Sequence, residues 1–395
     1  MNEVKTVEPI IISLLDIDLY KFTMQQVVFQ QYPNAVVRYQ FVCRNNGKKL
    51  GFIANEVRQQ LDLLANLRFT EEEIAYLTTK SYFKPDYIDF LKNLRLDPSL
   101  VKVEDADGQL MISAEGKWLD TILFEIYVLS IVNELYFRHT SKFENIKEEA
   151  DLRLTKKIWM LNQHPQLKVS EFGTRRRYSR TWQEHVLTRM INECPKNVVG
   201  TSNVYLAMKL GIPAHGTMAH EFISAHLGLV ENIREAQKRA FFSWLQEYDK
   251  DLGTALTDTF TTNAFFRDFG IVLSNGFTGM RHDSACPFEF ARKCIAHYKK
   301  LAIDPKTKTL IFSDGLTVRK AIEIFEMFVG EIGLAFGIGT HLTNDMSEFL
   351  EPLNIVMKLI WCNGKDCVKL SDNPGKNMGS QSMVKIVKTV YEVEE

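Results

Sequence analysis

The segment GIPAHGTMAHEFISAHLG (211–228) carries three of the nine histidines in this 395-residue chain, at positions 215, 220 and 226. Neither neighbouring pair has the i, i+4 spacing of a zinc-binding HExxH helix, so we expect no metal ion held by protein ligands here. His215 falls within an apolar run and His226 within a predicted helix, which favours structural roles for both. His220 follows GTMA at the end of a predicted strand, where a neutral imidazole could act as a nucleophile near pH 7 or could simply be satisfied by a neighbour.

Two glycine-containing turns could bind phosphate. The loop FGIGTHLTND (336–345) follows the apolar run IGLA, and SDGL (313–316) lies one predicted βα unit earlier. Glycine allows backbone N–H groups to approach a phosphate closely, and Thr340 adds a hydroxyl. No Walker lysine follows, so tight turns without a ligand are the alternative. Two such turns after adjacent strands are typical of the phosphate site that follows the last two strands of a barrel.

Arginines and a carboxylate follow two further predicted strands. The segment EFGTRRRYSR (171–180) carries arginines at 175, 176, 177 and 180. Arginine side chains bind carboxylates and phosphates through paired hydrogen bonds. We expect at least one of the three consecutive arginines to lie on a solvated basic face instead. In RHDS (281–284), Arg281 and Asp283 could contact an anionic substrate and a sugar hydroxyl, or merely pair with their neighbours.

These residues lie where short apolar runs end, from about residue 166 onward, and helical patterns such as 203–211 and 316–330 lie between the runs. Alternating strand and helix patterns predict a parallel sheet, and seven run ends without an obvious reversal favour a (β/α) barrel of the α/β class. The polar residues would then meet at the carboxyl ends of the strands, where barrel enzymes hold their chemistry. The run ends are 168–173, 197–202, 212–220, 255–259, 277–284, 310–315 and 334–340.

The first part of the chain, up to about residue 125, has a different pattern. A strand-like run at 35–44 is followed by a helical pattern at 51–67. Because 395 residues exceed one ordinary core, we expect two domains, or one large barrel with a smaller domain.

Composition limits the classes of partner. The formal net charge is −1, from 48 basic and 49 acidic residues, which argues against a nucleic-acid binder that relies on a broad basic field. The N-terminal segment lacks the order of a signal peptide, and no apolar run reaches the roughly 18–20 residues that a membrane helix requires. The six cysteines form no CxxC pair. We therefore expect a cytoplasmic protein with reduced thiols that binds neither nucleic acid nor membrane.

Taken together, nine segments along the chain resemble the nicotinate phosphoribosyltransferase family, in that family's order. The resemblance implies a homodimer with shared active sites, an irregular TIM-like (β/α) barrel and an α+β sandwich domain. The sandwich would be built from residues 1–128, joined by about 350–395, and the catalytic barrel from residues 129–349. The segments are LLDIDLYKFTM (14–24), SEFGTRRRYS (170–179), VGTSNVYLA (199–207), GTMAHEF (216–222), LTDTFTTNAFFRDF (256–269), RHDS (281–284), IFSDGL (311–316), FGIGTHLTND (336–345) and KLSDNPGK (369–376).

The activity that this resemblance implies joins nicotinate to 5-phosphoribosyl-1-diphosphate, which gives nicotinate mononucleotide and diphosphate for NAD biosynthesis. It also implies coupled ATP hydrolysis through a phosphohistidine, at the position that His220 occupies in GTMAHEF. Such an enzyme is a pentosyltransferase that is formally classed as a ligase. Mg²⁺ would be held mainly by the diphosphate oxygens, with no ligand required from the protein.

The resemblance also assigns roles position by position. Tyr20 would stack on the pyridine ring from the partner subunit, and Phe172 would cover the other face. Ser202 lies where the related nicotinamide enzyme has an aspartate, whose charge would repel the carboxylate of nicotinate, so serine favours the acid over the amide. Catalytic roles fall to His220, Arg281 and Asp283. The nicotinate contacts are Tyr20, Phe172, Arg175, Ser202, Thr217 and Arg281, and the phosphoribosyl diphosphate contacts are Arg176, Asp283, Ser313, Gly315, Gly339 and Thr340.

The chain departs from the family pattern at one place. The family usually reads DSGDP, where this chain has DSACP (283–287), so Ala285 and Cys286 replace a glycine and an aspartate. If that aspartate helps to hold ribose or magnesium, activity would be weakened or the site would use another carboxylate, and the chain could be a degraded paralogue or a non-catalytic binding protein. The alternative is that Cys286 is a buried bystander. A nicotinamide-type or quinolinate-type transferase and a zinc-dependent barrel hydrolase are the competing interpretations.

Overall fold

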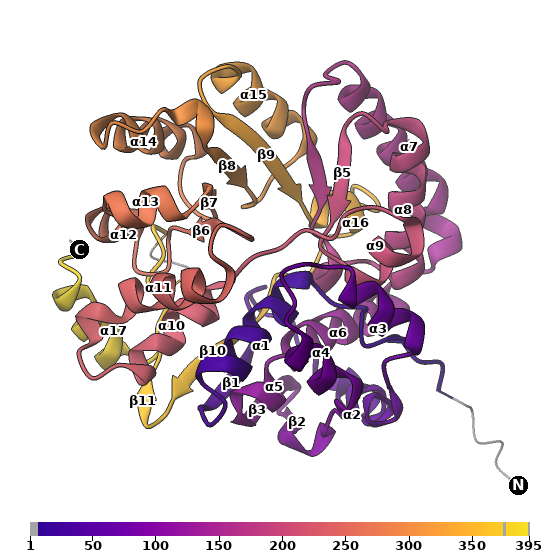
Figure 1. The fold of residues 1–395 in the computed structure, drawn as a ribbon. Coiled ribbons are helices and arrows are strands. Elements are labelled where there is room, and N and C mark those ends of the chain that lie inside the picture. The colour runs from indigo at the N-terminus through magenta and orange to yellow at the C-terminus, as the bar shows by residue number, and fades with distance from the viewer. Residues whose placement is uncertain (1–6, 374–376, 394–395) are drawn as a thin grey trace, which may run out of the picture.

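The computed structural model of the chain describes residues 7–373 and 377–393, and it contains a parallel and an antiparallel sheet. All six strands of the first sheet run parallel, in the order β5-β4-β9-β8-β7-β6. Parallel neighbours require a crossover between them, and helices provide it here (Figure 1). The strands are β4 (Val169–Glu171), β5 (Val198–Thr201), β6 (Thr254–Leu256), β7 (Gly279–His282), β8 (Thr309–Phe312) and β9 (Gly333–Ile338).

Six of the seven predicted run ends are strands of this sheet, which confirms the parallel sheet. The exception is 212–220, where Ala214 alone forms an isolated parallel bridge to Thr201. His220 therefore does not end a strand but begins the helix α10 (His220–Leu229). The helices of this part of the chain are α7 (Phe143–Asn162), α8 (Arg180–Glu193), α9 (Val204–Leu210), α11 (Ala236–Tyr248), α12 (Thr262–Asp268), α13 (Ile271–Gly276), α14 (Pro287–Lys300), α15 (Val318–Phe328) and α16 (Thr340–Thr343).

The parallel sheet is open in its strand pairing. Strands β5 and β6 stand at its two edges, and within the described residues no strand pairing joins them. The structure thus shows a mixed α/β fold with one parallel and one antiparallel sheet, and strand pairing alone does not close the parallel sheet into the predicted barrel.

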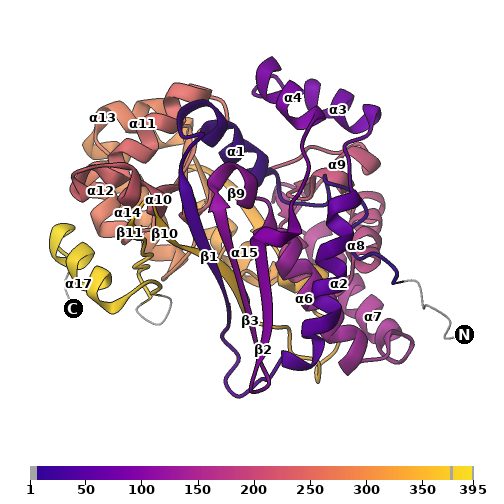
Figure 2. The same ribbon diagram turned by 90° about the horizontal axis from the view of Figure 1, so that it is seen from below.

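The antiparallel sheet joins the first and last parts of the chain. Its order is β11-β10-β1-β3-β2, and β1 from the first part of the chain pairs with β10 from the last part. Figure 1 shows these indigo and yellow segments side by side, and Figure 2 shows α2 beside β2 at the far edge. The strands are β1 (Val36–Cys43), β2 (Val101–Ala106), β3 (Gln109–Lys117), β10 (Ile355–Cys362) and β11 (Lys365–Asp366).

Strand β1 follows the alternation expected of a strand with one buried face. Val37, Tyr39 and Phe41 are buried, whereas the residues between them are partly exposed. No helix within residues 7–373 and 377–393 is both long and apolar enough to cross a membrane. The remaining helices are α1 (Leu19–Gln31), α2 (Ala54–Leu63), α3 (Glu71–Thr78), α4 (Pro85–Lys92), α5 (Trp118–Thr121), α6 (Phe124–Thr140) and α17 (Gln381–Val390).

Candidate active site

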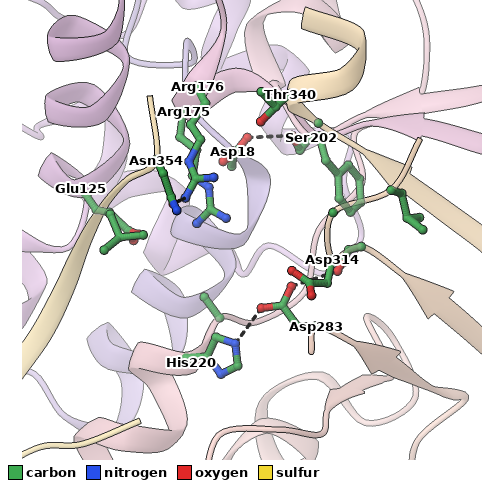
Figure 3. Close-up of a pocket in the computed structure, with 18 of the residues that line it drawn as sticks. Asp18, Glu125, Arg175, Arg176, Ser202, His220, Asp283, Asp314, Thr340 and Asn354 are labelled. Atoms are coloured by element: carbon green, nitrogen blue, oxygen red, sulfur yellow. Dashed lines mark hydrogen bonds and ion pairs between the residues drawn. The ribbon is translucent and has the colours of Figure 1, made fainter. Parts of the chain in front are cut away.

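A cavity of about 900 Å³ lies between the carboxyl ends of the parallel strands and the antiparallel sheet. The parallel sheet contributes the turns after its strands, and the antiparallel sheet contributes side chains of β1 and β10. Figure 3 shows His220 and Asp283 at one end of this cavity, and Ser202 and Thr340 at the other. Of the thirteen site residues predicted from the sequence, all except Thr217 line it: Tyr20, Phe172, Arg175, Arg176, Ser202, His220, Arg281, Asp283, Ser313, Gly315, Gly339 and Thr340.

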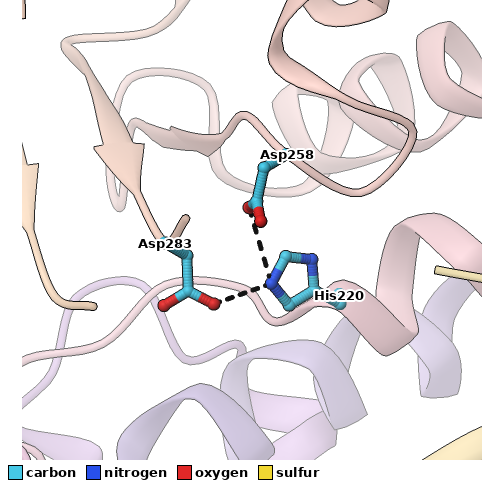
Figure 4. A group of neighbouring side chains, drawn as sticks. All are labelled: His220, Asp258 and Asp283. Atoms are coloured by element: carbon cyan, nitrogen blue, oxygen red, sulfur yellow. Dashed lines mark hydrogen bonds and ion pairs between the residues drawn. The ribbon is translucent and has the colours of Figure 1, made fainter. Parts of the chain in front are cut away.

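His220 is held by hydrogen bonds on both ring nitrogens, and Figure 4 shows the two aspartates that lie near its Nε2. Its Nδ1 lies 3.0 Å from Oγ1 of Thr259, and its Nε2 lies 2.8 Å from Oδ2 of Asp283. Asp258 is 3.6 Å from Nε2, and the ammonium of Lys369 is 2.8 Å from the same nitrogen. The ring is 5 % exposed yet lines the cavity, so it is both fixed and accessible to a ligand.

Burial and the neighbouring Lys369 ammonium lower the pKa of His220 to about 4, although Asp258 and Asp283 oppose that shift. Burial penalises the charged imidazolium because the interior solvates it poorly. The imidazole is therefore neutral near pH 7, the form that can act as a nucleophile.

His220, Asp258 and Asp283 also form a group with suitable ligand atoms for a metal ion, all within 4.8 Å of one another. A cation already lies among them, because the Lys369 ammonium is 3.2 Å from Asp258 and 3.8 Å from Asp283. A metal ion would have to displace this ammonium. The arrangement therefore supplies positive charge through lysine.

Arg281, Asp283 and Ser313 are joined to one another. The Arg281 Nε donates to Oγ of Ser313 over 2.8 Å, and its Nη2 donates to Oδ1 of Asp283 over 3.2 Å. Burial opposes ionisation of Asp283, but Arg281, His220 and Lys369 hold its pKa well below the usual value. Asp283 is thus a carboxylate that connects the arginine to the histidine.

The three consecutive arginines do not lie where they were expected. Arg175 and Arg176 line the cavity, and Arg176 also donates to the carbonyl of Ile355 and to Oδ1 of Asn354. Arg177 is completely buried and binds both carboxylate oxygens of Asp16, at 2.6 and 2.7 Å. The prediction that one of them lies on a solvated face is wrong: the arginine that misses the cavity is a buried structural residue.

Ser202 has a carboxylate beside it. Its hydroxyl donates to Oδ1 of Asp18 over 2.7 Å, and both side chains line the cavity. Burial raises the pKa of Asp18, and the hydrogen bond from Ser202 opposes that rise. Although position 202 is a serine, Asp18 therefore places a carboxyl group at this wall of the cavity. Arg175, which also lines the cavity, is the cation whose charge acts on Asp18.

Two aromatic side chains, Tyr20 and Phe172, line the cavity. The role of Tyr20 across a subunit interface stays a prediction. The Phe172 ring packs against the backbone of β9, where a Cβ on Gly337 would lie 2.3 Å from the ring. Glycine at 337 is what allows this close approach.

A second cavity of about 250 Å³ adjoins the first and shares Phe172, His215, Gly216 and Arg281 with it. Thr217 lines this smaller cavity. His215, expected to be structural, lines both cavities and bonds to Ser170 over 2.8 Å, whereas His226 is fully buried against Tyr32 and the Phe222 carbonyl. Each strand from β4 to β9 contributes a lining residue to the smaller cavity, so it lies on the concave side of the parallel sheet.

Where the chain departs from the family pattern, Ala285 keeps a backbone conformation that glycine favours. Ala285 has φ 65°, in the left-handed region that glycine favours. Cys286 is exposed and occupies the N-cap of α14 without a side-chain hydrogen bond to the helix. Cys286 therefore leaves this N-cap without a side-chain hydrogen bond, and Asp283 still lines the cavity.

We expect Cys286→Asp to stabilise the protein by about 1 kcal/mol, because aspartate at an N-cap accepts a hydrogen bond from the first turn. The free energy of unfolding in urea measures this effect. Cys286→Ala is the control, since alanine cannot cap, and it should give no gain. Equal stability of the aspartate and alanine variants would show that this N-terminus is already satisfied.

Several residues of the site were not predicted from the sequence. Asp258 and Thr259 follow β6, so the rule that polar residues follow strands could have identified them. Asp18 lies in the same DLYK segment as Tyr20. Lys369 comes from the segment KLSDNPGK (369–376), where no strand–helix alternation indicates a site. Residues 374–376 of this segment lie outside the described residues.

Known proteins resemble the chain over nearly its whole length. The nicotinate phosphoribosyltransferase (NAPRTase) family matches residues 167–395, and the N-terminal domain of that family matches residues 15–133. The chain belongs to the nicotinate phosphoribosyltransferase family. It is 46 % identical to the nicotinate phosphoribosyltransferase of Chromobacterium violaceum, over 98 % of each chain.

Two solved structures of the nicotinate phosphoribosyltransferase family share the fold. The crystal structure from Porphyromonas gingivalis has a TM-score of 0.91 at 38 % identity and covers 97 % of this chain and 100 % of its own. The structure from Vibrio cholerae has a TM-score of 0.92 at 37 % identity and covers 98 % and 95 %. Membership in the nicotinate phosphoribosyltransferase family thus extends over nearly the whole chain.

Proposed function

We propose that the chain transfers the phosphoribosyl group of 5-phosphoribosyl-1-diphosphate to nicotinate and couples this transfer to ATP through a phosphohistidine at His220. One observation carries the proposal: a single cavity gathers an aromatic pair, three arginines for anions and a buried neutral histidine. The product would be nicotinate mononucleotide, a precursor in NAD biosynthesis.

The transfer needs position and charge more than covalent chemistry. As diphosphate leaves, positive charge develops on the ribose, and the pyridine nitrogen attacks the anomeric carbon. Tyr20 and Phe172 would hold the pyridine ring, and Arg175 and Arg281 would contact its carboxylate. The smaller cavity carries Phe172, Thr217 and Arg281, which suits the far side of the ring.

The phosphate groups would lie toward the turns after β8 and β9. Gly315 has φ 55° and exposes its backbone, and Gly339 precedes α16. Arg176 and Thr340 would contact the same groups. The Ser313 hydroxyl is engaged with Arg281, so we assign it to the orientation of that arginine and of Asp283.

Magnesium fits the site as an ion brought by the diphosphate. Asp283 and Asp314 line the cavity, and carboxylate oxygens are ligands that Mg²⁺ prefers. When bound, the ion would neutralise the leaving diphosphate.

Phosphorylation of His220 would place a strongly charged group next to Lys369, which lies 2.8 Å from Nε2. The carboxylates of Asp258 and Asp283 near the same nitrogen would have to move away from it. A phosphoryl group forms charge-assisted hydrogen bonds with a cation such as Lys369, which would order the cavity wall for substrate. Hydrolysis of the phosphohistidine would then favour release of product.

For the fold, we propose an irregular barrel over residues 129–349 that is closed by the non-strand segment 212–217, and a sandwich domain over 1–128 with 350–395. The bridge from Ala214 to β5 and the hydrogen bond from Thr217 Oγ1 to the Thr254 carbonyl of β6, 3.3 Å long, support this closure. A cytoplasmic homodimer with shared active sites stays a prediction.

The test is a competition assay with 5-phosphoribosyl-1-diphosphate, Mg²⁺ and ATP, in which nicotinate, nicotinamide and quinolinate are each offered. We expect nicotinate mononucleotide as the main product. Equal or greater use of nicotinamide or quinolinate would favour the related transferases, and no product from any of the three would indicate a weakened paralogue.

The low pKa of His220 predicts how its phosphorylation depends on pH. With the pKa at about 4, the imidazole stays neutral from pH 8 down to pH 5.5, so the rate of labelling by ATP at saturating Mg²⁺ should be nearly flat. A histidine with an ordinary pKa of about 6.5 would instead lose about tenfold by pH 5.5. Such a loss would show that the cavity leaves the histidine unperturbed.

A further inference from the structure

One buried carboxylate beside the site lines neither cavity. Glu171 is the last residue of β4 and is 1 % exposed. Strand β4 lies in the middle of the three strands β5, β4 and β9, and Glu171 pairs in register with Thr201 of β5 and Ile338 of β9. Glu171 therefore lies where the turns after β4 and β5 begin.

Its carboxylate accepts hydrogen bonds from both turns. Oε1 accepts from the backbone N–H of Gly173, and Oε2 accepts from the Thr201 hydroxyl over 2.7 Å. Oε2 also accepts from Nε2 of Gln183 over 2.9 Å, which ties the carboxylate to α8. All three donors are neutral groups, and burial raises the pKa of Glu171 to about 7 against their effect.

The two turns carry opposite parts of the pyridine site. Phe172 and Arg175 lie on the turn that Gly173 begins, and Ser202 follows Thr201 directly. The fit is tight, because a Cβ on Gly173 would lie 2.1 Å from Oγ1 of Thr343 and 2.8 Å from Oε1 of Glu171. A shift of this carboxylate would therefore change the distance between Phe172 and Ser202.

We infer that Glu171 is a positioning residue, which sets the spacing of the Phe172 and Ser202 turns and so the affinity for nicotinate, without touching substrate. This inference rests on the proposed function. The Ser202 N–H donates to the Glu171 carbonyl over 2.8 Å, so the backbone of the same residue reinforces the link.

Glu171→Gln tests this role, because the amide nitrogen of glutamine would face a hydrogen-bond donor where a carboxylate oxygen now accepts a hydrogen bond. We expect KM for nicotinate to rise about tenfold, because a buried hydrogen bond is replaced by two donors that face each other. The kcat and the KM for phosphoribosyl diphosphate should change little. Thr201→Val removes one donor with a smaller change in shape and should act in the same direction. In the double variant the effects should be less than multiplicative, because both changes break one link.

Glu73→Gln is the matched control. Glu73 is also a buried carboxylate that accepts only from neutral groups, the Ser13 hydroxyl and the Thr70 N–H, but it lies in α3 away from both cavities. It should leave KM for nicotinate unchanged. Unchanged KM in Glu171→Gln and Thr201→Val, or equal effects on both substrates and on kcat, would overturn the inference. Absence of product from the unmodified chain in the same assay would instead refute the proposed function.

Discussion

Replacing His220 with alanine is expected to abolish the stimulation of product formation by ATP while a slow, ATP-independent transfer remains. The imidazole is the proposed acceptor of the phosphoryl group, and the residues proposed to hold nicotinate and the ribose stay in place. Coupling between two ligands in one protein is typically worth about 5–150-fold in affinity, so the loss should fall in this range at subsaturating substrate. Initial rates of nicotinate mononucleotide formation with and without ATP measure it.

His226→Asn is the control for this experiment. His226 lies on the same helix and is also buried, but it bonds to Tyr32 and to the Phe222 carbonyl outside the cavity. This variant should keep its ATP stimulation when the two are compared at temperatures where both are folded. If ATP still accelerated the His220→Ala enzyme as before, His220 would not be the coupling residue.

Replacing Arg177 with methionine is expected to destabilise the fold by about 3–5 kcal/mol, because it leaves the buried carboxylate of Asp16 without its partner. Burial alone would lower the pKa of Arg177, but Asp16 holds it above the usual value, which reflects the strength of the pair. Urea unfolding at pH 7 measures the loss. An anion-binding role for Arg177 would predict the reverse pattern, with normal stability and weak substrate binding.

Arg38→Met provides the matched control, because Arg38 also binds both oxygens of a carboxylate, that of Glu115, but on the surface. Its side chain is 43 % exposed, so its loss should cost no more than about 1 kcal/mol. Adding Asp16→Leu to Arg177→Met should recover part of the stability, since it removes the unpaired charge. If the two arginine variants were equally stable, the buried pair would not have the structural role assigned here.

The parallel sheet could be predicted because its strands are short apolar runs that end in polar or glycine residues. This local pattern placed Asp283, Ser313 and Thr340 after β7, β8 and β9, and the structure brings them to one cavity. The pattern failed at 212–220, where β-rich composition gives only one bridge, at Ala214, and His220 begins a helix. Composition alone does not distinguish a strand from an extended segment that closes a gap.

Contacts between segments that are far apart in the chain could not be predicted from such local patterns. Burial of Arg177 depends on Asp16, which lies 161 residues earlier, and the ammonium near His220 comes from Lys369, 149 residues later. Likewise, nothing local to Ser202 indicates that Asp18 lies against it. The resemblance identified twelve residues that line the cavity, but only the folded chain shows which of them bond to one another.

The most direct test of the proposed mechanism is to incubate the protein with ATP labelled on its γ-phosphate, locate the label, and then add nicotinate and phosphoribosyl diphosphate. We predict an acid-labile label on His220 that is released in step with the formation of nicotinate mononucleotide. Product that forms while the protein carries no such label, or a label on another residue, would contradict the central role of His220.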